Sequence, residues 1–147
     1  AWNVLPHPCA IEYIDTRCRD GHYRKYRYLV TGKTGIARHL VVADRWCVHA
    51  RDRIRGDEQI SEELAFTNSS NPFHDQLVAA REALELDFVA FDYSVDANGN
   101  LVVWEPNPYP CLWSSLNERD PYYEYQHRCI ANVFEHVLSF YLERAKR

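Results

Sequence analysis

Alternation of apolar and polar side chains in the first third of the chain predicts a β-sheet. Residues 23–30, YRKYRYLV, alternate aromatic or aliphatic side chains with basic ones, and residues 36–43, IARHLVVA, follow after the turn TGKTG. Two alternating runs around a glycine-containing turn are typical of an antiparallel hairpin. Because the half-apolar stretch 9–15, CAIEYID, precedes them, we expect an antiparallel unit of three strands.

Helical spacing replaces the alternation in three later segments. Residues 57–66 suit a short helix, and Asn71 is a candidate cap for a second helix with Pro72 at its first position. In residues 73–86 apolar side chains recur every three or four positions, as in an amphipathic helix. A longer apolar stripe with a basic end runs through residues 122–147, so we expect the longest helix there.

A second hairpin is predicted between these helices, and its register brings two carboxylates together. Asn98-Gly99 is the strongest short signal for a two-residue type I′ turn, which would pair Ala97 with Asn100. Counting back along both strands from that turn places Asp92 opposite Glu105. The order of strands, helix, hairpin and helix predicts an α+β fold, an antiparallel sheet with flanking helices.

Opposed carboxylates repel each other unless a cation or a shared proton lies between them. Asn107, on the same face two residues after Glu105, adds a neutral oxygen. Two carboxylates and an amide suit Mg²⁺ or Mn²⁺, and so sparse a set of ligands leaves room for nucleotide phosphate. The other interpretation is an ordinary hairpin with a solvated polar end, but the rest of this face is apolar, which weighs against it.

Composition narrows the class of protein. The 147 residues are 46% hydrophobic, which is enough for one domain with a core. The net charge of −4 gives the chain no general attraction to nucleic acid or to an anionic membrane. The five cysteines are odd in number and lack C-x-x-C spacing, and the sequence has no apolar run of about 18 residues. We therefore expect reduced cysteines and a soluble, cytoplasmic protein, and leave its oligomeric state open.

Residues 86–107, LDFVAFDYSVDANGNLVVWEPN, resemble the ATP-grasp ligases, a family that includes D-alanine-D-alanine ligase and glutathione synthetase. The C-terminal lobe of that family contains a strand with Asp, a turn, and a strand that ends Glu-x-Asn. The resemblance implies that Asp92, Glu105 and Asn107 hold Mg²⁺ ions against the phosphates of ATP, with the glutamate bridging them.

The resemblance extends upstream and covers roughly residues 9–112. It implies that Glu12, Tyr13 and Ile14, on a hinge strand, line the adenine pocket, and that Arg27 of the first hairpin faces the phosphates or an acyl-phosphate. From its residues alone, Arg27 could equally pair with an acid on the sheet.

The sequence departs from the family pattern in three places. Lys25 stands where the family often has an acid that contacts ribose, which leaves Asp15 or Asp20 as substitutes. Pro110-Cys111 replaces the usual Pro-Gly after the asparagine. The N-terminal domain and the central subdomain have no counterpart, and the sequence has no methionine, so we expect residues 1–147 to be a single domain from a longer ATP-grasp protein.

By resemblance, the chain is the ATP- and Mg²⁺-binding portion of an ATP-dependent carboxylate-amine or carboxylate-thiol ligase. Such an enzyme phosphorylates a small-molecule carboxylate to an acyl-phosphate, from which an amine or another nucleophile displaces phosphate. We expect the isolated portion to be inactive. The alternative hypothesis is a non-catalytic module that binds metal or nucleotide, or a scaffold with a degenerate ATP-grasp fold.

Overall fold

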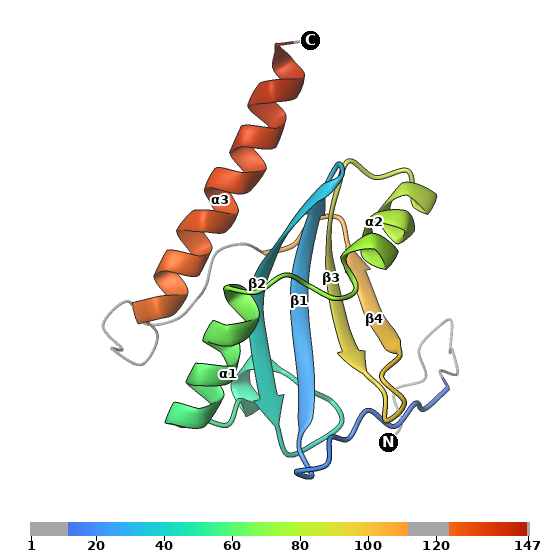
Figure 1. Ribbon diagram of the computed structural model, residues 1–147, viewed down its shortest axis with the longest axis vertical. Helices are drawn as coiled ribbons and strands as arrows, with labels where there is room; N and C mark the ends of the chain where they lie inside the picture. Colours follow the sequence, from blue (N-terminus) through green and yellow to red (C-terminus); the bar gives the residue numbers. More distant parts are fainter. Residues whose placement is uncertain (1–11, 112–123, 147) are drawn as a thin grey trace, which may run out of the picture.

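A four-stranded antiparallel sheet forms the centre of the computed structural model, which describes residues 12–111 and 124–146. The strand order across the sheet is β2-β1-β3-β4, with each neighbour antiparallel (Figure 1). In chain order the strands are β1 (Tyr23–Thr31), β2 (Thr34–Ala43), β3 (Phe88–Val95) and β4 (Leu101–Asn107). Both predicted hairpins are present.

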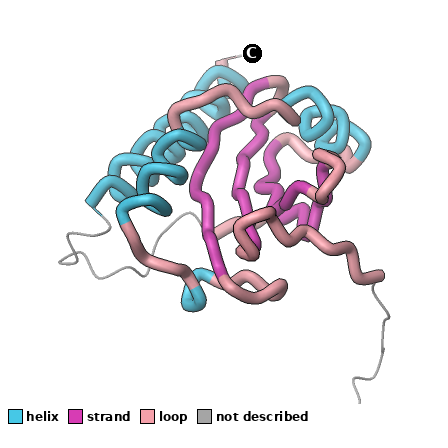
Figure 2. The backbone as a smooth tube through the Cα atoms, turned by 60° about the horizontal axis from the view of Figure 1, so that its bottom comes forward, coloured by secondary structure: helices cyan, strands magenta, loops and turns pink. Residues whose placement is uncertain are grey.

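Helices flank this sheet, as the cyan segments of Figure 2 show. Their bounds are Ala50–Asp52 for the short 3-10 helix η1, Asp57–Thr67 for α1, His74–Ala83 for α2 and Glu124–Ala145 for α3. The predicted α+β class, an antiparallel sheet with flanking helices, is therefore confirmed. No helix within the described residues is long and apolar enough to cross a membrane.

The cap predicted for the second helix lies too early in the sequence. Helix α2 begins at His74, with Phe73 in the cap position, rather than at Pro72. The Asn71 side chain instead accepts a hydrogen bond from the backbone N–H of Phe73 at 2.9 Å, which closes a turn before the helix. Asn71 thus orders the approach to the helix without capping it.

One face of the sheet, the aromatic face, holds the main core. Tyr26 and Tyr93 stack there with ring centroids 5.1 Å apart, and Phe91 is buried beside them. Leu77 of α2 and Phe66 of α1 pack onto the same cluster. Helices α1 and α2 therefore cover the aromatic face.

The opposite face, which we call the charged face, is apolar only at its two ends. At one end Leu29 and Ala90 pack against Val133 of α3. At the other end Tyr23 and Val41 pack against residues that include Val48, in the loop after β2. The middle of this face carries ionisable side chains.

Glu63 of α1 fixes the first turn of α3 to the sheet. It is fully buried and accepts hydrogen bonds from the backbone N–H of Leu40 at 3.2 Å and from Arg53 Nη1 at 2.5 Å. Tyr125 and Gln126 of α3 donate to the same carboxylate at 2.5 and 3.2 Å. These contacts tie α1, β2 and α3 together, and they satisfy a buried charge as its burial requires.

The expected three-stranded unit is not observed. Within the predicted strand 9–15, residues 9–11 lie outside the described part of the chain, and residues 12–15 form no strand. Strand β1 has no free edge for them, because β2 and β3 pair with its two sides. Upstream of β1, the described residues pair with the sheet through an isolated β-bridge between Arg17 and Tyr23.

The turn of the second hairpin differs from the prediction, yet the predicted carboxylate pair forms. Asp96 N–H donates to the Asn100 carbonyl and Gly99 N–H to the Asp96 carbonyl, both at 3.0 Å, so the loop has three residues rather than two. A three-residue loop alone would shift Asp92 away from Glu105. A β-bulge at Trp104 adds one residue to β4 and restores the pair.

Truncation of the core under α2 tests this layering. Leu77 is completely buried, so we expect Leu77→Ala to lower the free energy of unfolding by about 2–5 kcal/mol, measured by urea denaturation. Leu84, just after α2, is 46% exposed and serves as the control, because Leu84→Ala should change stability by about 0.5 kcal/mol or less. Equal losses for the two variants would contradict the packing of α2.

Candidate functional site

One ionisable side chain from each strand lies in a single row across the charged face. His39 of β2 is opposite Arg27 of β1, Arg27 is opposite Asp92 of β3, and Asp92 is opposite Glu105 of β4. These four residues, which we call the charged row, share one face because facing residues on paired strands point to the same side of a sheet. The row brings together three of the residues that the sequence predicts.

Asp92 and Arg27 form the centre of the row. The guanidinium makes two hydrogen bonds to the carboxylate, from Nε to Oδ1 at 2.5 Å and from Nη2 to Oδ2 at 2.8 Å, and Lys25 Nζ lies 3.2 Å from Oδ2. Asp92 is only 4% exposed. Burial acts to raise the pKa of Asp92, but the hydrogen bonds and charges of Arg27 and Lys25 outweigh it and hold the pKa below its usual range.

The donor set fits Mg²⁺ in kind, because Asp92, Glu105 and Asn107 supply two carboxylates and an amide oxygen on adjacent strands. Asp92 is already paired with Arg27 and Lys25, however. The Asn107 side-chain oxygen accepts a hydrogen bond from Tyr109 N–H at 2.9 Å. Glu105 is exposed, and none of the described residues donates a hydrogen bond to it. A cation at this place would compete with Arg27 and Lys25 for Asp92.

No cluster of three or more His, Cys, Asp or Glu side chains with the spacing of a metal site occurs within residues 12–111 and 124–146. Asn107 lies opposite Ala90, two pairs further along the strands than the charged row. The row is therefore primarily an arrangement of ion pairs, with Glu105 as its exposed acidic end.

A pocket of about 210 Å³ opens beside the acidic end of the row. We call it the tryptophan pocket, and its lining residues come from the loop after β2 and from strands β1, β3 and β4: Lys25, Trp46, Cys47, Val48, Asp92, Trp104 and Glu105. Trp104 Nε1 donates to Ser94 Oγ at 2.6 Å, and that hydroxyl donates to the Arg24 carbonyl at 2.5 Å. These bonds hold the Trp104 ring in place.

The residues predicted to line an adenine pocket are only partly near this site. Tyr13 packs edge-on against Trp46, with ring centroids 6.2 Å apart, so it borders the tryptophan pocket. Glu12 and Ile14 are exposed and belong to no strand. Of these three residues, Tyr13 is therefore the one with a recorded contact to a residue that lines the tryptophan pocket.

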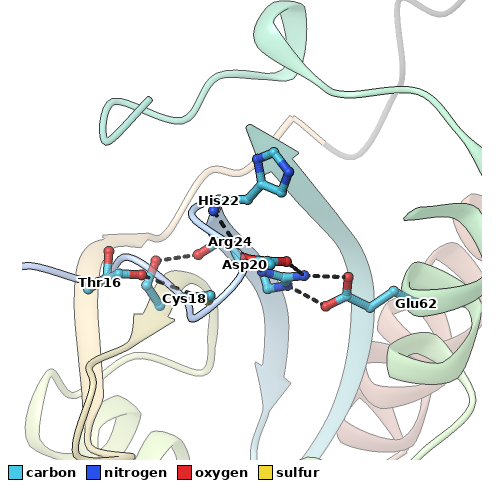
Figure 3. Close-up of polar contacts among 7 residues, drawn as sticks. Thr16, Cys18, Asp20, His22, Arg24 and Glu62 are labelled. Carbon is cyan, nitrogen blue, oxygen red and sulfur yellow. Dashed lines mark hydrogen bonds and ion pairs between the residues drawn. The ribbon is translucent and has the colours of Figure 1, made fainter. Parts of the chain in front are cut away.

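The two candidate substitutes for a ribose-binding acid have other partners. Asp20 receives two hydrogen bonds from Arg24, from Nη1 at 3.1 Å and Nη2 at 2.7 Å, and Figure 3 shows Arg24 between Asp20 and Glu62 of α1. These bonds lower the pKa of Asp20 to about 2. Asp15 accepts a hydrogen bond from the Arg17 backbone N–H at 3.0 Å. Asp20 thus anchors the turn before β1 to α1.

Two of the residues at the site had no role in the sequence prediction. Trp104 precedes Glu105 directly, but strand alternation assigns it to the opposite face, and only the bulge brings it to the pocket. Trp46 lies in the segment 44–53, which has neither clear alternation nor helical spacing. No signal in one sequence would have placed this loop over the sheet.

Comparison with known proteins gives partial structural likenesses. No family model matches the sequence, and no curated protein matches it. Macrocyclase MdnB from Microcystis aeruginosa MRC is 19% identical over 66% of this chain, with a TM-score of 0.39. ATP-grasp ligase PsnB, solved with a minimal precursor, Mg and ADP, is 19% identical over 74% of this chain, also with a TM-score of 0.39.

A third similar structure is a RiPP-associated ATP-grasp ligase from Chryseobacterium gregarium, solved with ADP and with a leader and core peptide. It is 14% identical over 63% of this chain, with a TM-score of 0.39. The chain spans between 27% and 33% of the length of these three structures. Two of the three are titled ATP-grasp ligases, the family that the sequence resembles, while the activity of this chain has to be inferred from its own residues.

Replacement of Asp92 tests the centre of the charged row. Asp92→Asn leaves Arg27 and Lys25 without their counter-ion, so we expect the free energy of unfolding at pH 7 to fall by about 3–5 kcal/mol. Because the pKa of Asp92 is lowered in the folded state, its contribution is complete above the unfolded pKa of about 3.9 and is lost as the pH falls further. Urea denaturation should show the two proteins converging below that pH.

Glu105→Gln is the matched control, because it removes the exposed carboxylate of the same row. We expect this substitution to change the free energy of unfolding by about 0.5 kcal/mol or less at both pH 7 and pH 3. A constant difference between wild type and Asp92→Asn from pH 7 down to pH 3 would contradict the assigned ion pair.

Proposed function

We propose that this chain is the nucleotide-binding part of an ATP-dependent ligase of the ATP-grasp type, and that the charged row receives the phosphates of ATP. The single observation that carries the proposal is the place of the row beside the tryptophan pocket. Cations of Lys25 and Arg27, the acid Glu105 and two indole rings meet there on one face of a rigid sheet.

The chemistry of the pocket supports a nucleotide over a simpler anion. Stacking of a base on an aromatic ring contributes about 1–3 kcal/mol per base, and Trp46 and Trp104 offer such surfaces. Tyr13 extends the aromatic surface through its contact with Trp46. Lys25 and Arg27 supply positive charge for the phosphates next to these rings.

In this proposal Arg27, Asp92, Glu105 and Asn107 each have a defined task. Arg27 binds the transferring phosphoryl group or the acyl-phosphate and stabilises the negative charge that develops there. Asp92, Glu105 and Asn107 would hold Mg²⁺, which neutralises phosphate charge when it is bound. Asp92 keeps Arg27 oriented until a phosphate oxygen takes its place at the guanidinium.

The carboxylate substrate is proposed as a small molecule, with an amine or thiol as the second substrate. Macrocyclase MdnC from Microcystis aeruginosa MRC, a further similar structure, is bound with a precursor peptide, and PsnB has also been solved with one. A peptide is therefore the other substrate to assay. We also propose that the chain functions as part of a longer protein that supplies the remaining contacts to both substrates.

A scaffold without catalysis is the competing proposal, and the engagement of Asp92 by two cations favours it. Titration of Mg²⁺ATP into the full-length protein, followed by calorimetry and by tryptophan fluorescence, separates the two functions. We expect binding with a change in indole emission, and we expect Glu105→Gln to weaken the affinity about tenfold because it removes a charged ligand.

Glu58→Gln provides the control, since Glu58 is also an exposed glutamate but lies on α1, away from the row. Its affinity should equal that of the wild type. Binding that is the same in Glu105→Gln as in wild type would show that the metal-site assignment is wrong, and absence of binding would favour the scaffold.

A further inference from the structure

Strand β2 contains its own bulge, next to the charged row. The register between β1 and β2 runs from Arg27 opposite His39 to Tyr28 opposite Ala37, so Arg38 is the extra residue. Arg38 is nevertheless only 6% exposed. Bulges often re-aim a side chain beside a functional site, and this one buries a guanidinium under the sheet surface.

Within the described part of the chain, the Arg38 guanidinium lacks the partners that a buried cation needs. Its Nη1 atom is buried without a hydrogen-bond partner, and among the described residues no carboxylate lies within ion-pair distance of it. Buried charges in proteins are normally paired and hydrogen-bonded, because an uncompensated charge costs several kcal/mol. An anion supplied from outside the chain would satisfy this group.

The acids close to Arg38 are already committed to other cations. Glu63 interacts with Arg38 electrostatically, but its oxygens are occupied by Arg53, Tyr125 and Gln126. Asp92, in the row beside it, is shared by Arg27 and Lys25. The local balance is therefore positive.

His39 adds a neutral hydrogen-bonding group to this positive region. Burial lowers the pKa of His39 well below its usual value, and the nearby charges of Arg38 and Arg27 lower it further. The imidazole is thus uncharged at neutral pH and can donate one hydrogen bond. An oxyanion beside Arg38 would find a planar guanidinium and an imidazole on adjacent residues.

We propose that Arg38 anchors an anion-binding site between β2 and α3, which takes a phosphate or carboxylate group. Guanidinium binds both groups through two parallel hydrogen bonds, which gives it geometric preference for planar and tetrahedral oxyanions over halide. Cys129 of α3 lies near Arg38. The site adjoins the charged row without using Glu105 or the tryptophan pocket, so it does not depend on the proposed nucleotide function.

Thermal unfolding in matched ionic strength tests the proposal. Sodium phosphate, compared with sodium chloride, should raise the Tm of the full-length wild type by several degrees, because a ligand of the folded state stabilises it. Arg38→Met keeps the length of the side chain and removes the unpaired charge. We expect its Tm in chloride to equal or exceed that of the wild type, and its response to phosphate to disappear.

Arg128→Met is the matched control, because Arg128 is an exposed arginine on the neighbouring helix α3. It should retain the full response to phosphate. A parallel titration with sodium acetate distinguishes a phosphate site from a carboxylate site, since a rise in Tm with acetate alone identifies a carboxylate site.

Two results would overturn the proposal. One is a wild-type Tm that phosphate and acetate leave unchanged relative to chloride, and the other is a full phosphate response in Arg38→Met. If Arg38→Met does not fold, Arg38→Lys and calorimetric titration of the wild type with phosphate replace it. The lysine variant should then bind phosphate about tenfold more weakly, because it loses the bidentate contact, and equal affinity would count against the site.

Discussion

The ion pair between Asp92 and Arg27 is the interaction on which the whole charged face depends. It joins the two central strands, β1 and β3, across the middle of the sheet, where Asp92 is almost completely buried. Without the carboxylate, two cations would remain in a poorly solvated place. Arg27 and Lys25 bind both oxygens of Asp92. Glu105, the exposed acid at the end of the row, is therefore the carboxylate that can contact a ligand.

The two faces of the sheet differ in content: the aromatic face holds the main core, and the charged face holds the ionisable row and the tryptophan pocket. The aromatic face is packed by α1 and α2 and holds most of the large buried side chains. On the charged face, α3 packs on one apolar end and the loop after β2 on the other. The tryptophan pocket opens beside the exposed acid Glu105. Each edge strand has a bulge beside the row, at Arg38 in β2 and at Trp104 in β4. The bulge at Trp104 brings an indole ring to the tryptophan pocket, and the bulge at Arg38 coincides with a buried guanidinium.

Periodicity predicted most of the elements because apolar side chains recur in them at strand or helix spacing. The two hairpins and the helices over residues 57–66 and 73–86 follow from it. The strand expected at 9–15 shows where prediction from periodicity fails, because local alternation does not reveal that both edges of β1 are already paired. The pairing of Asp92 with Glu105 was predicted from a turn that is not present, and it holds because the bulge at Trp104 offsets the longer loop.

Long-range electrostatics could not be predicted from the sequence in the same way. The sequence indicated that Arg27 faces either phosphate or an acid on the sheet, and the pair with Asp92 depends on β1 lying next to β3, which are 65 residues apart at this contact. Similarly, the burial of Arg38 depends on a bulge that no local motif marks.

The central claim is that the charged row and the tryptophan pocket form one ligand-binding surface. The most direct measurement is a two-dimensional ¹H–¹⁵N NMR titration of the protein with Mg²⁺ATP, with the indole N–H signals of Trp46 and Trp104 assigned by their Phe variants. We predict that both indole signals and the backbone signals of Arg27, Asp92 and Glu105 shift together and saturate. Shifts confined to residues outside the charged row and the tryptophan pocket, or no shifts at millimolar nucleotide, would contradict the claim.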